Sequence, residues 1–386
     1  MMHHHLGADY AVASSEAATR ARSIMEEKIA RGKASAERLW ESVHSAVPTD
    51  AVVRGRAMQF GYGLDVEHGE APITVTAGGT AMTIHRHALQ QLATKAGIPG
   101  QFLSELVASP DAWRRELAAR ILGDHYGRAT VVQGEDLSTS RHLVRAVGGQ
   151  VRGFLSDHYR RLDSRPLLEA FAGACQELQA VPVEGIVTDT RVALKAFLPM
   201  VFEPVPNEVM CLGVEWSNSD FGAGKHALRT FLFRLWCSNG ATVEDALSQV
   251  HLGARLADNI EFSDRTLYHD TQAQVGALGD VVRGALGPKG VSAVLDSIRQ
   301  ADEKKVEWKA VSNLIGRRLL KDELKLARDA FESDDVINLP AAKSVWRASN
   351  AISWISGKVE DQDRRLDLER LAGAVLRGKV EVEAAA

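Results

Sequence analysis

A pair of glycines, Gly148-Gly149, lies between two apolar-rich runs and constrains the fold more than any other stretch of the chain. A two-residue hairpin turn needs positive φ at both positions, which glycine adopts at little cost. The sequence therefore predicts an antiparallel hairpin in which Val147 faces Gln150 and Arg145 faces Arg152. Like charges that face each other destabilise a hairpin, so this register calls for an anion between the two arginines.

A second glycine pair, Gly78-Gly79, predicts another hairpin between short β-prone runs at 73–76 and 80–84. The other predicted strands alternate apolar and polar residues, whereas the predicted helices repeat apolar residues every three or four positions. The run 228–236 fits either pattern, and its threonine and phenylalanine content favours a strand. Further strands are expected at 183–188, 191–198 and 210–216, and further helices at 110–126, at 165–178 and along most of the chain beyond Ala241.

These patterns together predict an α+β protein with a central antiparallel sheet region, packed helices and a mostly helical C-terminal third. Its first helix, at 16–47, is either two helices or one helix kinked near Gly32. We expect four successive regions. These are an N-terminal helical segment at 1–50, a small β-hairpin with helices at 51–128, a central α+β core at 129–262 and a helical C-terminal region at 263–386.

The composition of the 386 residues, 45% hydrophobic and 25% charged, is that of a globular protein. No apolar run is long enough to span a membrane, so we expect no membrane contact. The three cysteines, Cys175, Cys211 and Cys237, are widely spaced, which suits a reducing cytoplasm and predicts neither a disulfide framework nor a zinc site. A net charge of −4 excludes a globally basic nucleic-acid-binding protein, so any site for a polyanion must be a local concentration of positive charge.

The segment from Arg141 to Gly240 combines basic and aromatic side chains as a groove for single-stranded nucleic acid does. Basic side chains neutralise phosphates, and aromatic rings stack on unpaired bases. The same segment holds eleven Lys and Arg against ten Asp and Glu, so solvated side chains paired with nearby acids remain the alternative interpretation. The candidate nucleic-acid-binding residues are Arg145, Arg152, Phe154, Tyr159, Arg160, Arg161, Arg191, Lys195, Lys225, Arg229 and Arg234.

Carboxylates in this segment offer a second interpretation, a metal-dependent nuclease or related phosphodiesterase. Two carboxylates and water suffice to hold Mg²⁺, but no pair here has a diagnostic spacing. The scattered histidines and the glycine-rich stretches at 61–63 and 222–225 complete no metal, nucleotide or dinucleotide motif. We therefore expect no catalytic residue, no metal and no cofactor. The carboxylates considered are Asp157, Asp163, Asp189, Glu215 and Asp220.

Several stretches resemble the phage/plasmid-like protein family, a domain of unknown function numbered 932. They read VRGFLSDHYRRLD at 151–163, WSNSDFG at 216–222 and FRLWCSNG at 233–240, and they follow an earlier LQQL run at 89–92 and a GIP run at 97–99. The resemblance extends over roughly the middle half of the chain. That family is carried by phages, prophages and plasmids, so the resemblance implies a role in the DNA metabolism of mobile elements. It implies no catalytic residue, because the family has no agreed chemistry.

The order of predicted elements is also similar to the cores of single-strand annealing proteins of the Redβ and RecT kind. Such proteins need no cofactor and work as rings or filaments. We therefore expect a cytoplasmic, non-enzymatic protein of a mobile element in a bacterial host, which binds single-stranded DNA and promotes annealing as a homo-oligomer. The alternatives left open are a metal-dependent nuclease and an interaction protein that binds a host factor.

Overall fold

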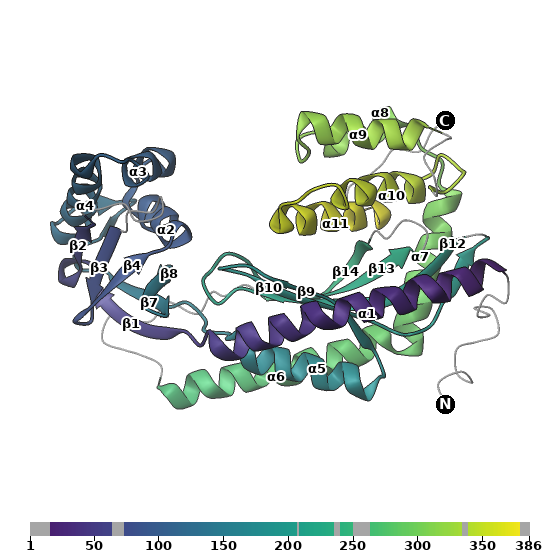
Figure 1. Ribbon diagram of the computed structural model, residues 1–386, viewed down its shortest axis with the longest axis horizontal. Helices are drawn as coiled ribbons and strands as arrows, with labels where there is room; N and C mark the ends of the chain where they lie inside the picture. Colours follow the sequence, from purple (N-terminus) through teal and green to yellow (C-terminus); the bar gives the residue numbers. More distant parts are fainter. Residues whose placement is uncertain are drawn as a thin grey trace.

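The computed structural model describes residues 16–63, 73–206, 208–234, 240–249, 263–333 and 339–378. Within them the chain forms an α+β protein of two lobes, each built around its own sheet (Figure 1). The larger hydrophobic cores of the two lobes share no residue. No described helix is both long and apolar enough to cross a membrane.

The first lobe holds a six-stranded sheet of order β1-β7-β8-β4-β3-β2. The β4–β8 pair is parallel and the other neighbours are antiparallel. Helices α2, α3 and α4 pack on this sheet and bury its apolar residues. The elements are β1 (Thr49–Arg54), a 3₁₀ turn (Gly55–Ala57), β2 (Gln59–Tyr62), β3 (Ile73–Ala77), β4 (Thr80–Ile84), α2 (Arg86–Ala96), α3 (Gly100–Val107), α4 (Ala112–Gly127), the small pair β5 (Val131–Val132) and β6 (Glu135–Asp136), β7 (Arg141–Val147) and β8 (Gln150–Ser156).

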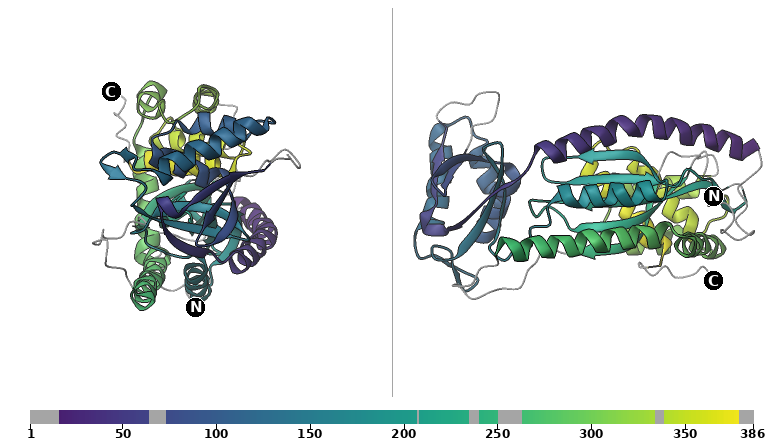
Figure 2. Two further views of the ribbon diagram at one scale, coloured as in Figure 1. Left: turned by 90° about the vertical axis from the view of Figure 1, so that its left-hand side faces the viewer. Right: turned by 90° about the horizontal axis from the view of Figure 1, so that it is seen from below.

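The second lobe is an antiparallel sheet of order β14-β13-β12-β10-β9, with β11 paired to β12. Its long helices lie on both faces and along the β9 edge, as the views from the side and from below show (Figures 1 and 2). The elements are α1 (Glu16–Ser45), α5 (Ser164–Glu177), β9 (Val181–Val187), β10 (Val192–Phe197), β11 (Phe202–Val205), β12 (Glu208–Asn218), β13 (His226–Arg234), β14 (Gly240–Gln249), α6 (Asp264–Leu286), α7 (Pro288–Glu303), α8 (Trp308–Ile315), α9 (Lys321–Glu332), α10 (Val345–Ser356) and α11 (Gln362–Leu376).

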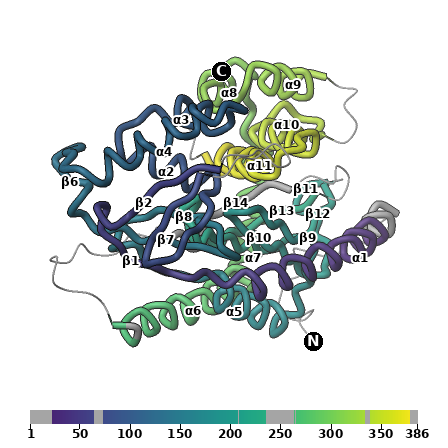
Figure 3. Tube along the Cα trace, turned by 60° about the vertical axis from the view of Figure 1, so that its left-hand side comes forward, coloured from purple at the N-terminus to yellow at the C-terminus, as the bar shows by residue number. Residues whose placement is uncertain are grey.

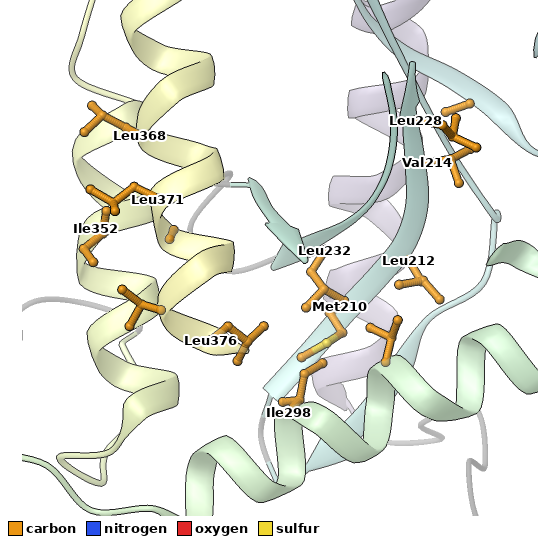
Figure 4. Packing of buried hydrophobic residues seen from close by; sticks show 14 of the residues in the cluster. Met210, Leu212, Val214, Leu228, Leu232, Ile298, Ile352, Leu368, Leu371 and Leu376 are labelled. Atoms are coloured by element: carbon orange, nitrogen blue, oxygen red, sulfur yellow. The ribbon is translucent and has the colours of Figure 1, made fainter. Parts of the chain in front are cut away.

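The core of the second lobe extends from the sheet to the C-terminal helices. Leu232 of β13 and Met210 of β12 lie near Ile298 of α7, and Leu371 of α11 packs with Ile352 of α10 (Figure 4). All five side chains are buried in one apolar cluster. The mostly helical C-terminal third predicted from the sequence is therefore part of the second lobe's core.

Both predicted hairpins are confirmed. Gly78-Gly79 joins β3 to β4 and Gly148-Gly149 joins β7 to β8, and all four glycines have positive φ. Val147 pairs with Gln150 as predicted, but the register shifts between Arg145 and Ala146, so that Arg145 lies opposite Gly153. The predicted pairing of Arg145 with Arg152 is therefore wrong, because a bulge moves the partner strand by one residue.

The run 228–236 is strand as favoured, since β13 covers its described part. The sheets, however, do not follow the expected regional boundaries. Strands β7 and β8 pair with β1 and β4, so the first sheet takes strands from both sides of the boundary predicted at 128/129. Helix α1, expected as a separate N-terminal segment, packs along β9 of the second lobe.

Helix α1 is one continuous helix, and Gly32 within it marks a close approach to the sheet. A Cβ at Gly32 would lie 2.2 Å from the carbonyl oxygen of Val183 in β9, and one at Gly185 would lie 2.3 Å from the oxygen of Ser35. The Ser35 hydroxyl accepts a hydrogen bond from the Gly185 N–H at 2.9 Å. Gly32 therefore lets the helix touch the strand backbone and does not break the helix.

Candidate nucleic-acid interface at the junction of the lobes

The loop at 219–225, between β12 and β13, joins the second lobe to the first. The carbonyl of Phe221 accepts hydrogen bonds from Gln91 Nε2 at 2.9 Å and from His87 Nε2 at 3.1 Å. Gln91 Oε1 accepts from the backbone N–H of Phe154 at 2.7 Å. Gln91 of α2 therefore ties strand β8 and the loop of the other lobe together.

Arg145 lies at the centre of this junction, where its side chain is 1% exposed. Its guanidinium donates to Asp50 Oδ1 at 2.7 Å, to Asp163 Oδ1 at 2.6 Å and to the carbonyl of Asp220 at 2.9 Å. Burial opposes the charge, but Asp163 and Asp50 outweigh it and raise the pKa of Arg145. The anion that the sequence requires beside Arg145 is thus supplied by the chain's own carboxylates.

Asp220 is the most unusual carboxylate of the junction. Its Oδ1 accepts from the Ser164 N–H at 2.8 Å, from Ser164 Oγ at 2.7 Å and from Asn218 Nδ2 at 3.1 Å. Burial, reinforced by the charge of Asp163, raises the pKa of Asp220 to about 6. Nearby, the Tyr159 hydroxyl donates to the carbonyl of Ser219 at 3.0 Å. Asp220 therefore fastens the loop to the start of α5, and Tyr159 links the loop to the segment that follows β8.

Three of the stretches singled out in the sequence meet at this junction. The run 89–92 supplies Gln91, the stretch 151–163 supplies Asp163, and the stretch 216–222 supplies the docked loop. Of the stretch 233–240, the part 235–239 lies outside the described residues, and 233–234 ends β13 opposite Cys211 and Met210. The sequence pattern therefore marks one connected region of the fold.

Lys195, predicted on a basic strand face, is buried between β10 and α11. Its Nζ contacts Glu369 Oε2 at 2.5 Å and Glu184 Oε2 at 3.1 Å. Burial alone would lower the pKa of Lys195, but Glu184 and Glu369 outweigh it and raise the pKa. The face expected to meet DNA is instead covered by α1 and α11.

The same correction applies to five other predicted residues, each of which is buried. Arg234 forms a bidentate pair with Glu208, and Arg229 donates to Ser217 Oγ at 2.8 Å. A buried, paired cation has no free charge for a phosphate, and a buried ring cannot stack on a base. The predicted residues that the structure withdraws from a surface role are Arg145, Phe154, Tyr159, Lys195, Arg229 and Arg234.

Arg160 and Arg161 keep some exposure, but each is held by a carboxylate. Arg160 binds both oxygens of Asp270 in α6, and Arg161 Nε lies 3.3 Å from Asp50. These pairs fasten the segment after β8 to α6 and to β1. Arg160 and Arg161 therefore contribute to the junction more than to an open surface.

The remaining predicted residues, Arg152, Arg191 and Lys225, belong to segments that meet at the junction. Arg152 Nη1 donates to the carbonyl of Asp189 at 3.3 Å, and Arg191 Nε donates to that of Ala223 at 2.6 Å. Lys225 ends the same loop and is exposed. These contacts bring the 188–191 turn, the 219–225 loop and strand β8 together.

Arg86, at the start of α2, belongs to the same region and was not among the predicted residues. It is exposed, and its charge and that of Arg152 both act on His85. The sequence signal was the basic run His85-Arg86-His87 beside a predicted strand end. We define Arg86, Arg152, Arg191 and Lys225 as the basic junction face.

Two histidines and two carboxylates adjoin the basic junction face. His85 Nε2 lies 3.3 Å from Asp189, and Arg191 Nη1 lies 3.2 Å from Asp363. Burial lowers the pKa of both His85 and His87. Near neutral pH the histidines therefore add no positive charge to the face.

A cavity of about 40 Å³ lies beneath the face, between Arg152, Asp189, Arg191 and Asp220. This volume has room for a few water molecules and is far too small for a nucleotide. Among the described residues, no three His, Cys, Asp or Glu side chains are grouped so that they could hold a metal ion. A ligand would therefore lie on the face and not within the junction.

The carboxylates considered for a nuclease already have partners. Asp157 pairs with Arg141 at 2.9 Å, Asp163 with Arg145, and Asp189 with His85. Glu215 is fully buried, with its nearest cation, Arg229, at 3.6 Å. The geometry therefore brings no pair of them together around an open position.

Comparison with known proteins returned no match, whether to a family model, to a curated protein or to a solved structure.

Proposed function

We propose that this protein binds single-stranded DNA, without catalysis, at the basic junction face. The observation that carries the proposal is that four basic residues come from segments that meet at the lobe junction: Arg86, Arg152, Arg191 and Lys225. Basic side chains gathered on one surface attract the phosphates of a nucleic acid by releasing its counterions.

The charges of the face favour an anion even after its own carboxylates are counted. Within the described part of the chain, Arg86 and Lys225 have no ion-pair partner, whereas Arg191 shares its charge with Asp363. The Asp189 side chain is 66% exposed and lies beside His85. Four cations against two carboxylates leave a local excess of positive charge on a chain whose net charge is −4.

The choice of DNA over another anion is supported by the sequence resemblance to proteins of phages and plasmids. Three of the resembling stretches build the junction on which the face lies. Annealing by a homo-oligomer, expected from the same resemblance, belongs to this proposal. Light scattering of the free and DNA-bound protein would test it, since a monomer in both states would contradict an oligomer.

Fluorescence anisotropy of a labelled oligo(dT) and a matched duplex, each titrated with the protein at low and moderate salt, tests the proposal. The apparent slope of log K against log salt is about −0.7 for each phosphate contact with a single strand. Four contacts therefore predict affinity falling roughly fifty-fold between 50 and 200 mM salt. Binding that prefers the duplex or ignores salt would contradict the proposal.

A variant with Arg86→Ala, Arg152→Ala and Lys225→Ala should bind oligo(dT) at least tenfold more weakly than the wild type. The matched control replaces three exposed arginines outside the face, Arg31, Arg128 and Arg165, with alanine. Because both variants lose the same charge, equal weakening would show a non-specific effect. Unchanged binding by the first variant would refute the assignment to this face.

A further inference from the structure

A groove between α8 and α9 of the second lobe has no part in the proposed DNA site. The two helices lie beside one another beyond α10 and α11, as Figures 1 and 3 show. The groove has a volume of about 1000 Å³. This is at the upper end of the usual range for ligand sites, about 300–1000 Å³.

One wall of the groove carries a line of cations. Lys321, Lys325 and Arg328 of α9 line it, and their spacing of four and then three residues places them on one side of the helix. Lys309 of α8 faces them across the groove. Within the described part of the chain none of these four forms an ion pair, whereas Lys343 at the rim is held by Glu332 at 2.6 Å.

The acidic side chains of the groove do not balance this charge. Besides the paired Glu332, the lining includes Glu307 and Asp329. Four unpaired cations against two carboxylates leave an excess of positive charge. The groove is therefore suited to an anionic occupant.

The floor of the groove is apolar. Trp308 and Phe331 pack with their ring centres 5.5 Å apart, and Trp308 is only 6% exposed. Leu324 of α9 lines the groove, and Leu320, which immediately precedes α9 and lies outside the groove lining, is 66% exposed. Each of these leucines is next in sequence to a lysine of the cationic line, Lys321 or Lys325, and adds apolar surface there.

The floor distinguishes between the anions that could bind. Bases of a nucleic acid would need an open aromatic face to stack on, and the rings of Trp308 and Phe331 are buried. A protein helix with acidic side chains along one side and apolar side chains beside them matches this surface, since its carboxylates meet the cations and its apolar residues cover Leu320 and Leu324.

We propose that the α8–α9 groove binds an acidic, amphipathic helical segment of a partner protein. The carboxylates of the segment contact Lys321, Lys325 and Arg328, and its apolar side contacts Leu320 and Leu324. This site is independent of the proposed function, because the groove shares no residue with the basic junction face. Sequence reasoning placed this part of the chain among the helices expected beyond Ala241 and gave its basic residues no role.

The test uses the full-length protein and three labelled probes at low and moderate salt. These are a short helical peptide of Glu and Leu with its leucines on one side, a control peptide with serine in place of leucine, and oligo(dT). The Glu/Leu peptide should bind in a salt-dependent way and more tightly than the Glu/Ser peptide. Failure of the Glu/Leu peptide to bind at low salt, or equal binding of both peptides, would overturn the proposal.

Two variants locate the site. A variant with Lys321→Ala, Lys325→Ala and Arg328→Ala should bind the Glu/Leu peptide about tenfold more weakly. Leu320→Ser, at a position too exposed to disturb folding, should also weaken it. The control is again the alanine variant of Arg31, Arg128 and Arg165, which should bind the peptide as the wild type does.

The binding of oligo(dT) separates this proposal from the DNA site. The groove variant should bind oligo(dT) as the wild type does, and the junction-face variant should bind the Glu/Leu peptide normally. If the groove variant lost oligo(dT) binding and kept peptide binding, the groove would be a nucleic-acid site and the proposal wrong.

Discussion

Arg145 shows how a residue that reads as a surface cation can be a structural one. Its guanidinium is satisfied by Asp50, Asp163 and the carbonyl of Asp220, which come from β1, from the segment before α5 and from the β12–β13 loop. The sequence predicted an anion beside Arg145 from a pairing with Arg152 that the structure does not contain, although carboxylates do neutralise Arg145. These partners could not be predicted, because Asp50 lies 95 residues away and the Asp220 carbonyl lies 75 residues away.

Arg145→Ala should lower the free energy of unfolding by about 2–3 kcal/mol, because it removes a buried donor from the Asp220 carbonyl and from the partly exposed carboxylates of Asp50 and Asp163. Arg152→Ala should change it by less than about 0.5 kcal/mol, since Arg152 is partly exposed and donates to one backbone carbonyl. Denaturant unfolding of the two variants measures the contrast. Similar small effects would mean that Arg145 is not the centre of the junction.

His142 is a fully buried histidine that must stay neutral in the folded protein. Its Nδ1 accepts from Lys95 Nζ at 3.1 Å, and its ring packs against Phe154 and Tyr126. Burial, with the charge of Lys95, lowers the pKa of His142 to about 4. A histidine in an unfolded chain has a pKa near 6.5. Between about pH 6.5 and pH 4, His142 is therefore protonated in the unfolded chain and neutral in the folded protein.

The contribution of His142 to stability is therefore complete above pH 6.5 and is lost as the pH falls toward 4. The loss should reach about 3 kcal/mol. Asp220 acts in the opposite direction, because its raised pKa favours the folded state as the pH falls through about 6. Unfolding curves at several pH values for the wild type and for His142→Gln separate the contribution of His142 from that of the other groups. On acidification the free energy of unfolding of the wild type should fall by more than that of the variant. Parallel pH profiles would contradict this.

At the scale of elements, the local signals predicted more than the long-range ones. Glycine pairs gave both hairpins, because a turn with positive φ depends on the turn residues alone. The bulge at Arg145 and the pairing of β7 with β1 were not predicted. They depend on contacts with residues outside the hairpin, which no local sequence pattern indicates. For the same reason the predicted basic strand faces proved to be covered by helices α1 and α11, which lie far from them in the chain.

Gly32 provides a test of how α1 packs on the sheet. Alanine favours a helix over glycine by about 1 kcal/mol, yet a Cβ here would lie 2.2 Å from the Val183 oxygen. We predict that Gly32→Ala lowers the free energy of unfolding by about 1–3 kcal/mol through overpacking.

The control for Gly32 is Gly123 of α4, where a Cβ would meet no atom within 4 Å. Gly123→Ala should stabilise the protein by about 0.5–1 kcal/mol, as helix propensity alone predicts. Thermal or denaturant unfolding compares the two. A stabilising effect at both positions would show that α1 does not approach β9 as closely as described.

At the scale of the whole molecule, the two lobes meet through a polar junction whose outer side carries the basic junction face (Figure 1). Of the eleven residues predicted to bind nucleic acid, only Arg152, Arg191 and Lys225 reach this face. The pattern that found them was the mixture of basic and aromatic side chains between Arg141 and Gly240. The burial of the other residues was missed because the alternation of a strand does not say whether a helix covers its polar face. Arg86 was missed because its role depends on the docking of α2 against the second lobe.

Hydrogen–deuterium exchange of the protein, with and without saturating oligo(dT), tests the central claim most directly, because it maps where DNA lies. Binding at the basic junction face predicts slower exchange in the start of α2, in the 188–191 turn and in the 219–225 loop, with α8 and α9 unchanged. Slower exchange confined to α8 and α9, or no change anywhere at saturation, would contradict the proposal that the junction of the lobes binds single-stranded DNA.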